Sequence, residues 1–322
     1  MRLGQLRESS DPIPIKFKIV TPSFNQVRFV ERAVRSVIAQ APGVYELQYV
    51  VYDAESTDGS QDVLKRLVRE FPQISLIIEP DNGQSDALQK GFFQTDADVL
   101  GWLNADDILM PETLKNVARI FSSTGAQLVY GDSWFIDEGD QILGLYPTLR
   151  FDREFLKTFC YVSQPSAFFK RDIYAAVSGI DRRLRFCMDY DLWIRISEMT
   201  NDILYINKVL AATRLHSQSK TSIASLEFVD EIFSMLRSRV GYVPVEWGVY
   251  REYRRLSLRK ESNAWPPSLV FLQALIREGV KHRKLSKLCR WSVQVLQIYL
   301  KKYFEASRSV NANYKSVIKV SK

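Results

Sequence analysis

The stretch L-G-W-L-N-A-D-D-I-L-M-P, residues 100–111, decides how the rest of the sequence is interpreted. Its first part is apolar and short enough for a buried strand, and it runs directly into Asn104, Asp106 and Asp107. Two carboxylates at the end of a buried strand repel each other unless a cation lies near them. Two interpretations remain open from this stretch alone. The aspartates cap a helix that begins near Pro111, or they bind a divalent metal such as Mg²⁺ or Mn²⁺.

Composition restricts the class of protein. The chain has 322 residues and 46% hydrophobic content, which is enough for one α/β core of ordinary size and an appendage. Its three cysteines, Cys160, Cys187 and Cys289, are irregularly spaced and favour a reducing compartment over a disulfide framework. We see no apolar signal sequence and no long apolar run, so we expect a cytoplasmic protein without a membrane span.

Charge is distributed unevenly along the chain. The first 225 residues carry 25 basic and 29 acidic side chains, whereas the residues from Leu226 onward carry 19 basic and 8 acidic ones. Such a tail suits anionic lipid headgroups or nucleic acid, but no nucleic-acid-binding module is visible, so we expect no nucleic-acid partner. Apolar tail positions at helical spacing, such as Leu288, Leu296 and Tyr303, leave two interpretations open. The tail lies peripherally on the inner face of a membrane, or it packs as a helical hairpin on the rest of the chain or in an oligomer.

Short apolar strands alternate with amphipathic helices before the tail. The predicted strands cover residues 17–20, 47–52, 74–78, 99–103 and 126–130, and the predicted helices cover 29–38, 61–70, a segment ending near 94, and 111–121. This alternation predicts an α/β fold with a Rossmann-like, mostly parallel sheet and helices on both faces. Because ligands bind outside the carboxyl ends of such strands, we expect Thr21, Asp53, Asp86 and Asp106 to converge on one crevice.

Six motifs follow one another along the chain. They are T-P-S-F-N at 21–25, D-A-E-S-T-D-G-S at 53–60, N-A-D-D at 104–107, Q-P-S-A-F-F at 164–169, M-D-Y-D-L-W-I-R at 188–195 and R-L-H at 214–216. Together they resemble the family 2 glycosyltransferases with the GT-A fold, over about residues 16–222. The resemblance implies transfer of a sugar from a nucleotide-sugar donor, mostly with inversion, with a divalent metal, Mn²⁺ or Mg²⁺, as cofactor.

The resemblance also implies roles for residues on the nucleotide side. Thr21 and Pro22 would line the nucleotide pocket, and Asp53 would accept a hydrogen bond from the base. Gln84 and Asp86, both in G-Q-S-D-A-L, would contact the nucleotide sugar, with Asp86 near the base or ribose.

On the side where the reaction takes place, Asn104 and Asp106 would occupy the D-x-D position of the family, with Asp106 on the metal. Asp189 would be the general base. His216 would touch the metal or the diphosphate, and Arg214 beside it would bind the donor. Asn104 is a departure from the family, because it replaces a charged ligand by a neutral one and would weaken metal binding.

Structural interpretations remain open beside these roles. Met188 replaces the usual acidic neighbour of Asp189, which leaves that carboxylate with less like charge. Asp189 alternatively caps the helix that it begins, and His216 alternatively serves as a structural donor. We expect Asp191 to cap the helix or to face solvent, and Trp193 to pack in the core. Residues 164–166 border the acceptor or form a plain loop.

We divide the chain into a flexible N-terminal segment, 1–15, a GT-A domain, 16–225, and a basic helical region, 226–322. The leading hypothesis is a metal-dependent inverting glycosyltransferase of bacterial surface polysaccharide synthesis, acting on a glycan or lipid-linked sugar. One alternative is a nucleotidyltransferase, which would need a Gly-rich basic phosphate loop that residues 21–25 lack. The other is a non-catalytic nucleotide-sugar-binding protein, in which Asp189 would have no measurable function.

Overall fold

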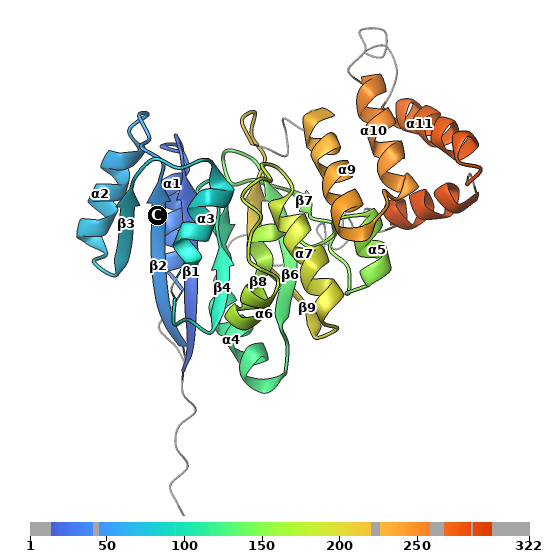
Figure 1. The fold of residues 1–322 in the computed structure, drawn as a ribbon. Coiled ribbons are helices and arrows are strands. Elements are labelled where there is room, and N and C mark those ends of the chain that lie inside the picture. Colours follow the sequence, from blue (N-terminus) through green and yellow to red (C-terminus); the bar gives the residue numbers. More distant parts are fainter. Residues whose placement is uncertain are drawn as a thin grey trace, which may run out of the picture.

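The computed structural model describes residues 14–40, 45–93, 95–219, 226–257, 267–284 and 286–297. The strands are β1 (Ile15–Ser23), β2 (Tyr45–Asp53), β3 (Ile74–Ile78), β4 (Val99–Trp102), β5 (Ile108–Leu109), β6 (Leu128–Ile136), β7 (Ile142–Leu145), β8 (Ala167–Lys170) and β9 (Ile203–Arg214). They form one nine-stranded sheet in the order β3-β2-β1-β4-β8-β6-β9-β5, and β7 pairs with β6 (Figure 1). The pairs β1–β2, β1–β4, β2–β3 and β6–β9 are parallel. The predicted α/β, mostly parallel sheet of the GT-A type is confirmed.

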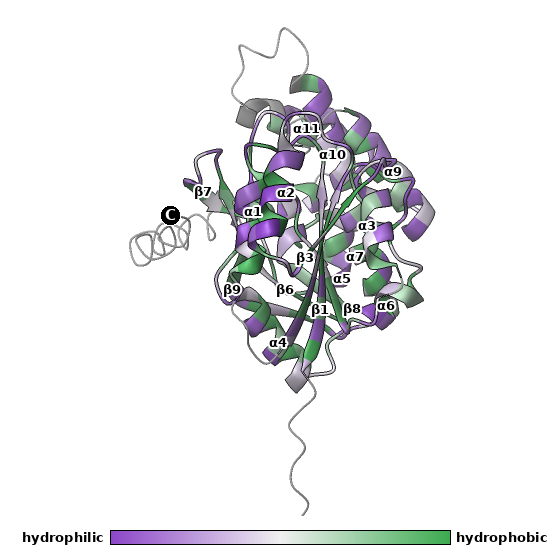
Figure 2. Cartoon of the chain, turned by 90° about the vertical axis from the view of Figure 1, so that its left-hand side faces the viewer, coloured by the Kyte–Doolittle hydropathy of each residue, from purple (hydrophilic) through white to green (hydrophobic). Residues whose placement is uncertain are grey.

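Helices cover both faces of this sheet. They are α1 (Val30–Ile38), α2 (Ser60–Glu70), α3 (Gln84–Phe92), α4 (Thr113–Ser123), α5 (Arg153–Thr158), α6 (Arg171–Ala176) and α7 (Met188–Met199), with a short 3-10 helix at Gln164–Ser166. Figure 2 shows α1, α2 and α4 on one side of the sheet and α3, α6 and α7 on the other. Each side has its own core. Phe17 and Ile19 of β1 belong to the core under α1, and Val20 belongs to the core under α3.

Strand β4 lies in the middle of the sheet and is buried along its whole length, which explains its continuous apolar sequence. Its Gly101 allows Phe168 to pack closely, because a Cβ at this position would lie 2.8 Å from the ring. Trp193 of α7 is fully buried and stacks on Trp102, with 5.9 Å between the ring centroids. The predicted core position of Trp193 is therefore confirmed.

Several predicted boundaries differ from the structure; the strand expected at 126–130, for example, is β6 at Leu128–Ile136. β1 continues to Ser23 instead of turning after Val20, because it pairs with β2 up to the register partner Asp53. On its other side, β1 pairs with β4 only up to Val20. Pro22, which has no backbone N–H to donate, therefore lies beyond that pairing and interrupts no hydrogen bond to β4. The helix expected from Pro111 begins at Thr113, because Glu112 before it has a left-handed backbone conformation with φ +61°, which an α-helix cannot include.

The C-terminal region is helical where the structure describes it, with α9 (Leu226–Val240), α10 (Val245–Ser257), α11 (Pro267–Lys281) and a helical segment at 286–297. Helix α9 is part of the main core, because Ile232, Met235 and Leu236 pack in the same cluster as Trp193. Leu288 is buried among apolar residues of α10 and α11. These contacts agree with the interpretation of a packed helical region. Tyr303 lies outside the described residues, and the membrane contact stays a prediction.

Across the part of the chain that the structure describes, no helix combines the length and the apolar character needed to span a bilayer.

A substitution at Gly131 in β6 tests how closely β6 and β9 pack against each other. A Cβ added there would lie 2.6 Å from the backbone oxygen of Lys208, so the strands would have to move apart. We expect Gly131→Ala to lower the free energy of unfolding by about 1–3 kcal/mol, measured by urea denaturation. The matched control is Gly144→Ala in β7, where a Cβ meets nothing within 4 Å and the change should stay within about 0.5 kcal/mol. Equal losses in both variants would contradict this account.

Candidate active site

The carboxyl ends of β1, β2 and β4 lie side by side at one edge of the sheet. Ser23 is the register partner of Asp53, and its hydroxyl donates to Oδ2 of Asp53 at 3.0 Å. Asp53 is buried and also accepts hydrogen bonds from the backbone N–H and hydroxyl of Ser56, at 2.8 and 2.7 Å. The N–H of Leu103 donates to the oxygen of Val20 at 3.0 Å. Asp53 and the loop after β4 therefore share this edge, as the sequence predicts.

Thr21, near the end of β1, lies differently from the prediction that it lines a nucleotide pocket. The side chain of Thr21 is fully buried, and its hydroxyl lies 3.0 Å from the hydroxyl of Tyr49. Thr21 therefore points into the core, since its side chain pairs with the neighbouring strand. Pro22 is partly exposed at the same edge.

The loop after β4 is tied to the end of β9. Asp106 Oδ2 lies 3.0 Å from Nε2 of His216, the side chain of Asp106 being 17% exposed and that of His216 only 3%. The buried Asp107 accepts hydrogen bonds from the backbone N–H of Arg214 at 2.9 Å and from the amide of Asn104 at 3.1 Å. Two residues that are far apart in the sequence, Asp106 and His216, thus meet in one site.

The two adjacent aspartates differ in environment. Burial, and then the charge of Asp106, raise the pKa of Asp107 well above its ordinary value, although the Arg214 N–H and the Asn104 amide act in the opposite direction. A cation at Asp106 would favour the ionised form of Asp107. The loop is therefore electrostatically suited to a positive charge at Asp106.

Arg214 has a different position from the one we predicted. Its guanidinium is fully buried, with hydrogen bonds to the backbone oxygens of Asp106 and Asp137 at 2.8 and 2.6 Å and an ion pair with Asp140 at 2.5 Å. Its charge also lies 5.0 Å from the ring centroid of Phe29. The guanidinium is covered by protein atoms and supports the loop that carries Asp106, while its Nη2 has no hydrogen-bond partner among the described residues. Donor binding by Arg214 stays a prediction.

The first turn of α3 borders the same loop. Gln84 donates to Oδ1 of Asn104 at 2.5 Å. Asp86 is buried, accepts a hydrogen bond from the backbone of Asn82 at 3.2 Å, and forms ion pairs with Arg182 at 3.1 Å and Lys90 at 3.5 Å. Gln84 is therefore at the edge of the site, whereas Asp86 connects α3 with the segment before α7.

Asp189 lies on the first turn of α7, which contacts the first turn of α3. The hydroxyl of Ser85 lies 2.5 Å from the oxygen of Leu184 and 2.9 Å from Sδ of Met188. The N-cap of α7 is Cys187, so the alternative that Asp189 is the N-cap is wrong. Asp189 is partly exposed, and its charge, after burial, raises the pKa of the Cys160 thiol. Gln164, of the short 3-10 helix, donates to the oxygen of Trp102 at 2.8 Å.

The donor set fits a metal that is held jointly with a phosphorylated ligand. Within the described residues, no three His, Cys, Asp or Glu side chains are grouped so as to hold a metal by themselves. Asp106 and His216 supply one oxygen and one nitrogen, and the remaining positions would be taken by ligand oxygens and water. Mg²⁺ is commonly bound in this way, through one or two carboxylates and substrate phosphates.

A family model described as glycosyl transferase family 2 matches residues 18–177, about half of the chain. The chain belongs to this family. The match includes the strands that carry Asp53 and Asp106 and ends before Asp189 and His216.

Relatives of this glycosyltransferase include bacterial proteins of similar length. It is 24% identical to an uncharacterized glycosyltransferase of Nostoc sp., over 77% of this chain and 84% of the relative. It is 22% identical to the putative teichuronic acid biosynthesis glycosyltransferase TuaG of Bacillus subtilis, over 75% of this chain and 90% of that protein. It is also 24% identical to the chondroitin synthase of Pasteurella multocida, over 65% of this chain but only 21% of the synthase.

Solved structures show the same fold. TarS of S. aureus in complex with UDP-GlcNAc is similar with a TM-score of 0.58 and 14% identity, over 82% of this chain and 80% of that one. The mannosyltransferase PcManGT of Pyrobaculum calidifontis, in complex with GDP-Man and Mn²⁺, gives a TM-score of 0.56 and 13% identity, over 87% and 86%. Because the sequence identities are only 13–14%, these structures show that the chain has the same fold and no more.

Helix α9 of this glycosyltransferase holds the segment before Asp189, which the sequence analysis missed. The carboxylate of Glu231 accepts hydrogen bonds from the backbone N–H groups of Arg185, Phe186 and Cys187, at 2.8, 2.7 and 2.8 Å. No local sequence pattern indicates this contact, because the partners are more than forty residues apart.

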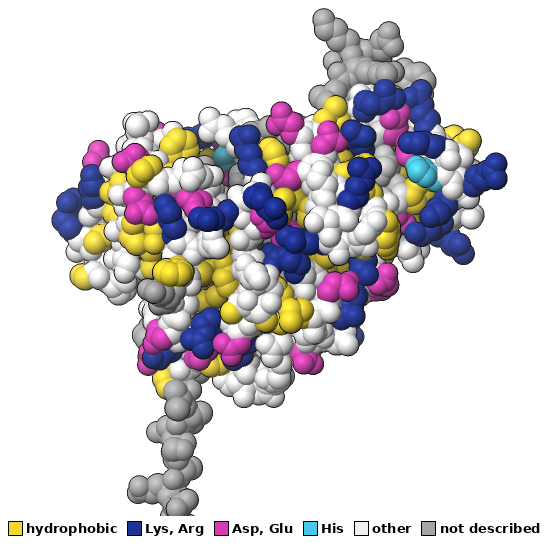
Figure 3. All heavy atoms as spheres, in the orientation of Figure 1, with side chains coloured by type: hydrophobic (Ala, Val, Ile, Leu, Met, Phe, Trp, Pro, Cys, Tyr) yellow, Lys and Arg dark blue, Asp and Glu magenta, His cyan; other side chains and the backbone are white. Residues whose placement is uncertain are grey.

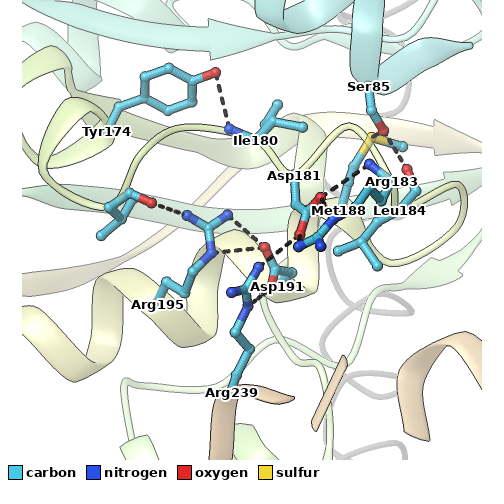
Figure 4. A network of polar contacts seen from close by, with 11 residues as sticks. Ser85, Tyr174, Ile180, Asp181, Arg183, Leu184, Met188, Asp191, Arg195 and Arg239 are labelled. Carbon is cyan, nitrogen blue, oxygen red and sulfur yellow. Dashed lines mark hydrogen bonds and ion pairs between the residues drawn. The ribbon is translucent and has the colours of Figure 1, made fainter. Parts of the chain in front are cut away.

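The expectation that Asp191 caps the helix or faces solvent is wrong. Asp191 has no exposed surface, and it pairs with Arg195 of its own helix at 2.5 Å and with Arg239 of α9 at 2.7 Å (Figure 4). Arg239 also pairs with Asp181 at 2.9 Å. The i, i+4 spacing of Asp191 and Arg195 among apolar residues was the available signal for a buried ion pair.

Glu231 tests whether α9 supports the loop before Asp189. We expect Glu231→Gln to lower the free energy of unfolding by about 1–3 kcal/mol, because a neutral amide oxygen accepts three backbone N–H groups less well than a carboxylate does. The measurement is denaturant unfolding at neutral pH. Glu227→Gln, on the exposed first turn of the same helix, is the control and should be near neutral. An unchanged midpoint in Glu231→Gln would remove this role.

Proposed function

We propose that this family 2 glycosyltransferase transfers a sugar from a nucleotide-sugar donor to an acceptor hydroxyl with inversion, in a reaction that depends on Mn²⁺ or Mg²⁺. The observation that carries the proposal is the meeting of Asp106 and His216 at 3.0 Å, on the sheet edge that also holds Asp53. Contacts between α3 and α7 bring Asp189 toward the same edge, since Gln84 borders the loop of Asp106 and the next residue contacts α7.

Asp189 is proposed as the general base. It takes the proton of the acceptor hydroxyl as that oxygen forms its bond to the anomeric carbon of the donor sugar. The bond from this carbon to the diphosphate breaks on the opposite side, so the configuration inverts and a nucleoside diphosphate leaves. The partial exposure of Asp189 at the start of α7 gives an acceptor access to the carboxylate.

The donor is proposed to lie along the ends of β1, β2 and β4. Pro22 and Asp53 would face the base, Gln84 and Asn104 would hydrogen-bond the ribose or sugar, and Asp86 would hold α3 in place beside them. Thr21 and Arg214 are assigned supporting roles, because both side chains are buried. A metal on Asp106 and His216 would neutralise the charge that develops on the leaving diphosphate.

The acceptor and the cellular setting are proposed from the relatives. Names such as teichuronic acid biosynthesis glycosyltransferase favour a bacterial surface polysaccharide, built on a glycan or lipid-linked sugar. We propose that the protein works on the cytoplasmic side and that the basic region 226–322 contacts the membrane peripherally. The catalytic domain, 16–225, would then act together with α9. A non-catalytic nucleotide-sugar-binding protein remains the alternative, and the first experiment below separates the two.

Asp189→Asn should lower kcat by a factor of about 100 or more, because the amide cannot accept the proton. Donor affinity, measured by titration calorimetry, should stay within about twofold, since the donor is held by other residues. The control is Asp172→Asn at the start of α6, with a side chain that is 84% exposed. Full turnover in Asp189→Asn would end the assignment of the base. A wild-type protein that binds donors without turnover would favour the non-catalytic alternative.

Asp106→Ala should abolish the effect of metal on donor binding. In the wild type we expect Mn²⁺ to tighten the binding of the nucleotide sugar at least tenfold, while Mn²⁺ alone binds weakly because the protein supplies only two ligand atoms. A thermal-shift screen of nucleotide sugars with and without Mn²⁺ measures this. Asp62→Ala, exposed on α2, is the control. A metal effect that persists in Asp106→Ala would exclude this ligand.

A further inference from the structure

A hollow lies outside the candidate active site. It has a volume of about 420 Å³ and is lined by Gln89 of α3, residues 177–183, Arg195 of α7 and Arg239 of α9. Figure 3 shows Lys and Arg side chains gathered in the middle of the face over which α3, α7 and α9 lie. The volume is within the range of small-molecule sites.

Four arginines border this hollow, and their carboxylate partners lie behind or beside them. Asp191 is fully buried beneath Arg195 and Arg239, as Figure 4 shows. Asp181 pairs with Arg239 and, at 2.7 Å, with Arg183. Hydrogen bonds from Arg183 hold the pKa of Asp181 at about 2, against the effect of burial and with help from Arg239. The ion pairs of Asp181 are therefore formed at neutral pH.

The arrangement leaves guanidinium donors available. The fourth arginine, Arg182, pairs through Nη1 with Asp86. Among the described residues, no acceptor pairs with Nη2 of Arg182, with Nη1 of Arg183 or with Nη1 of Arg239. With Asp86 included, four guanidiniums face three carboxylates, so the hollow keeps a net positive charge.

The hollow shares two helices with the residues proposed for catalysis. Arg195 follows Asp189 by six residues on α7, which corresponds to about 9 Å along the helix axis and about 120° around it. Gln89 follows Gln84 by five residues on α3, which corresponds to about 8 Å along the axis and about 140° around it. An acceptor with its hydroxyl at Asp189 therefore reaches the hollow only if it is extended and continues around α7.

We propose that this hollow is a subsite for a phosphate group, monoester or diester, of the acceptor. That the phosphate belongs to an acceptor rests on the proposed function, whereas phosphate binding in the hollow can be tested separately. The available guanidinium donors come from two elements, the 177–183 segment and α9, while Arg195 of α7 adds its charge but donates to Asp191 and to the oxygen of Val177. Such an arrangement suits a tetrahedral anion with three or four oxygens better than a carboxylate with two. The ion pairs with Asp181 and Asp191 hold the guanidiniums in place before the anion arrives.

Titration calorimetry with inorganic phosphate and with glycerol phosphate, at constant ionic strength and without metal, measures the site directly. We expect Arg183→Gln to weaken phosphate binding at least fivefold and Arg182→Gln/Arg183→Gln to weaken it further. Arg183→Lys should fall between, because it keeps the charge but loses the planar fork. Both arginines are exposed, at 60% and 84%, so the variants leave the buried pairs of Asp191 intact. Arg119→Gln, exposed on α4, is the matched control.

Two further variants separate this site from the proposed function. Asp106→Ala and Asp189→Asn should both keep wild-type phosphate affinity, because neither residue borders the hollow. Loss of phosphate binding in Asp106→Ala would assign the anion to the donor site and overturn the proposal. Equal affinity of the wild type and Arg182→Gln/Arg183→Gln, or no binding by the wild type, would overturn it as well. Tighter binding of glycerol phosphate than of inorganic phosphate would support an esterified ligand.

Discussion

Asp191 has no exposed surface, so its charge has to be compensated inside the protein, and much of the C-terminal half depends on how this is done. Arg195 comes from the same helix, but Arg239 comes from α9, outside the range of the family match. Breaking a buried ion pair by removing one partner costs several kcal/mol, because the remaining charge is uncompensated. Helix α9 is therefore fixed against α7, and Glu231 on the same helix orders the segment that leads to Asp189.

The same constraint acts at the other end of the candidate site. Asp107 is buried after β4 and obtains its hydrogen bonds from Asn104 and from the backbone of Arg214 at the end of β9. The hydrogen bond from the Arg214 N–H to Asp107 holds the end of β9 against the loop, and His216, two residues further on, lies beside Asp106. The two more accessible acids, Asp106 and Asp189, are thus positioned by contacts of their buried neighbours. Buried charges therefore hold the frame of the candidate site, and the two acids proposed to act in it are less buried than Asp107 and Asp191.

The sequence predicted the sheet, and the edge at which polar side chains follow its strands, because both features follow from local patterns. Strand β3 has the predicted bounds, and Asp53 lies at the predicted edge, since periodicity and turn residues determine such features. The expectation for Asp191 was wrong, and the burial of Arg214 was not foreseen, because pairing with residues distant in sequence allows these charged side chains to be buried. Whether a charge is buried depends on partners such as Arg239, and spacing along the chain carries no information about a partner on another element. The family resemblance located the motifs, but it could not show which of their side chains are buried and hold the loops in place, and which are exposed.

Asn104, which we regarded as a loss for metal binding, has a physical reason in this structure. Its amide nitrogen donates to the buried Asp107 at 3.1 Å, and its oxygen accepts from Gln84 at 2.5 Å. An aspartate at this position would have no hydrogen to donate, and it would add a third negative charge beside Asp106 and Asp107, where burial already raises the pKa of Asp107. The neutral side chain therefore stabilises the loop without a metal, and under the proposed function it would leave charge compensation at Asp106 to a cation that arrives with its ligand.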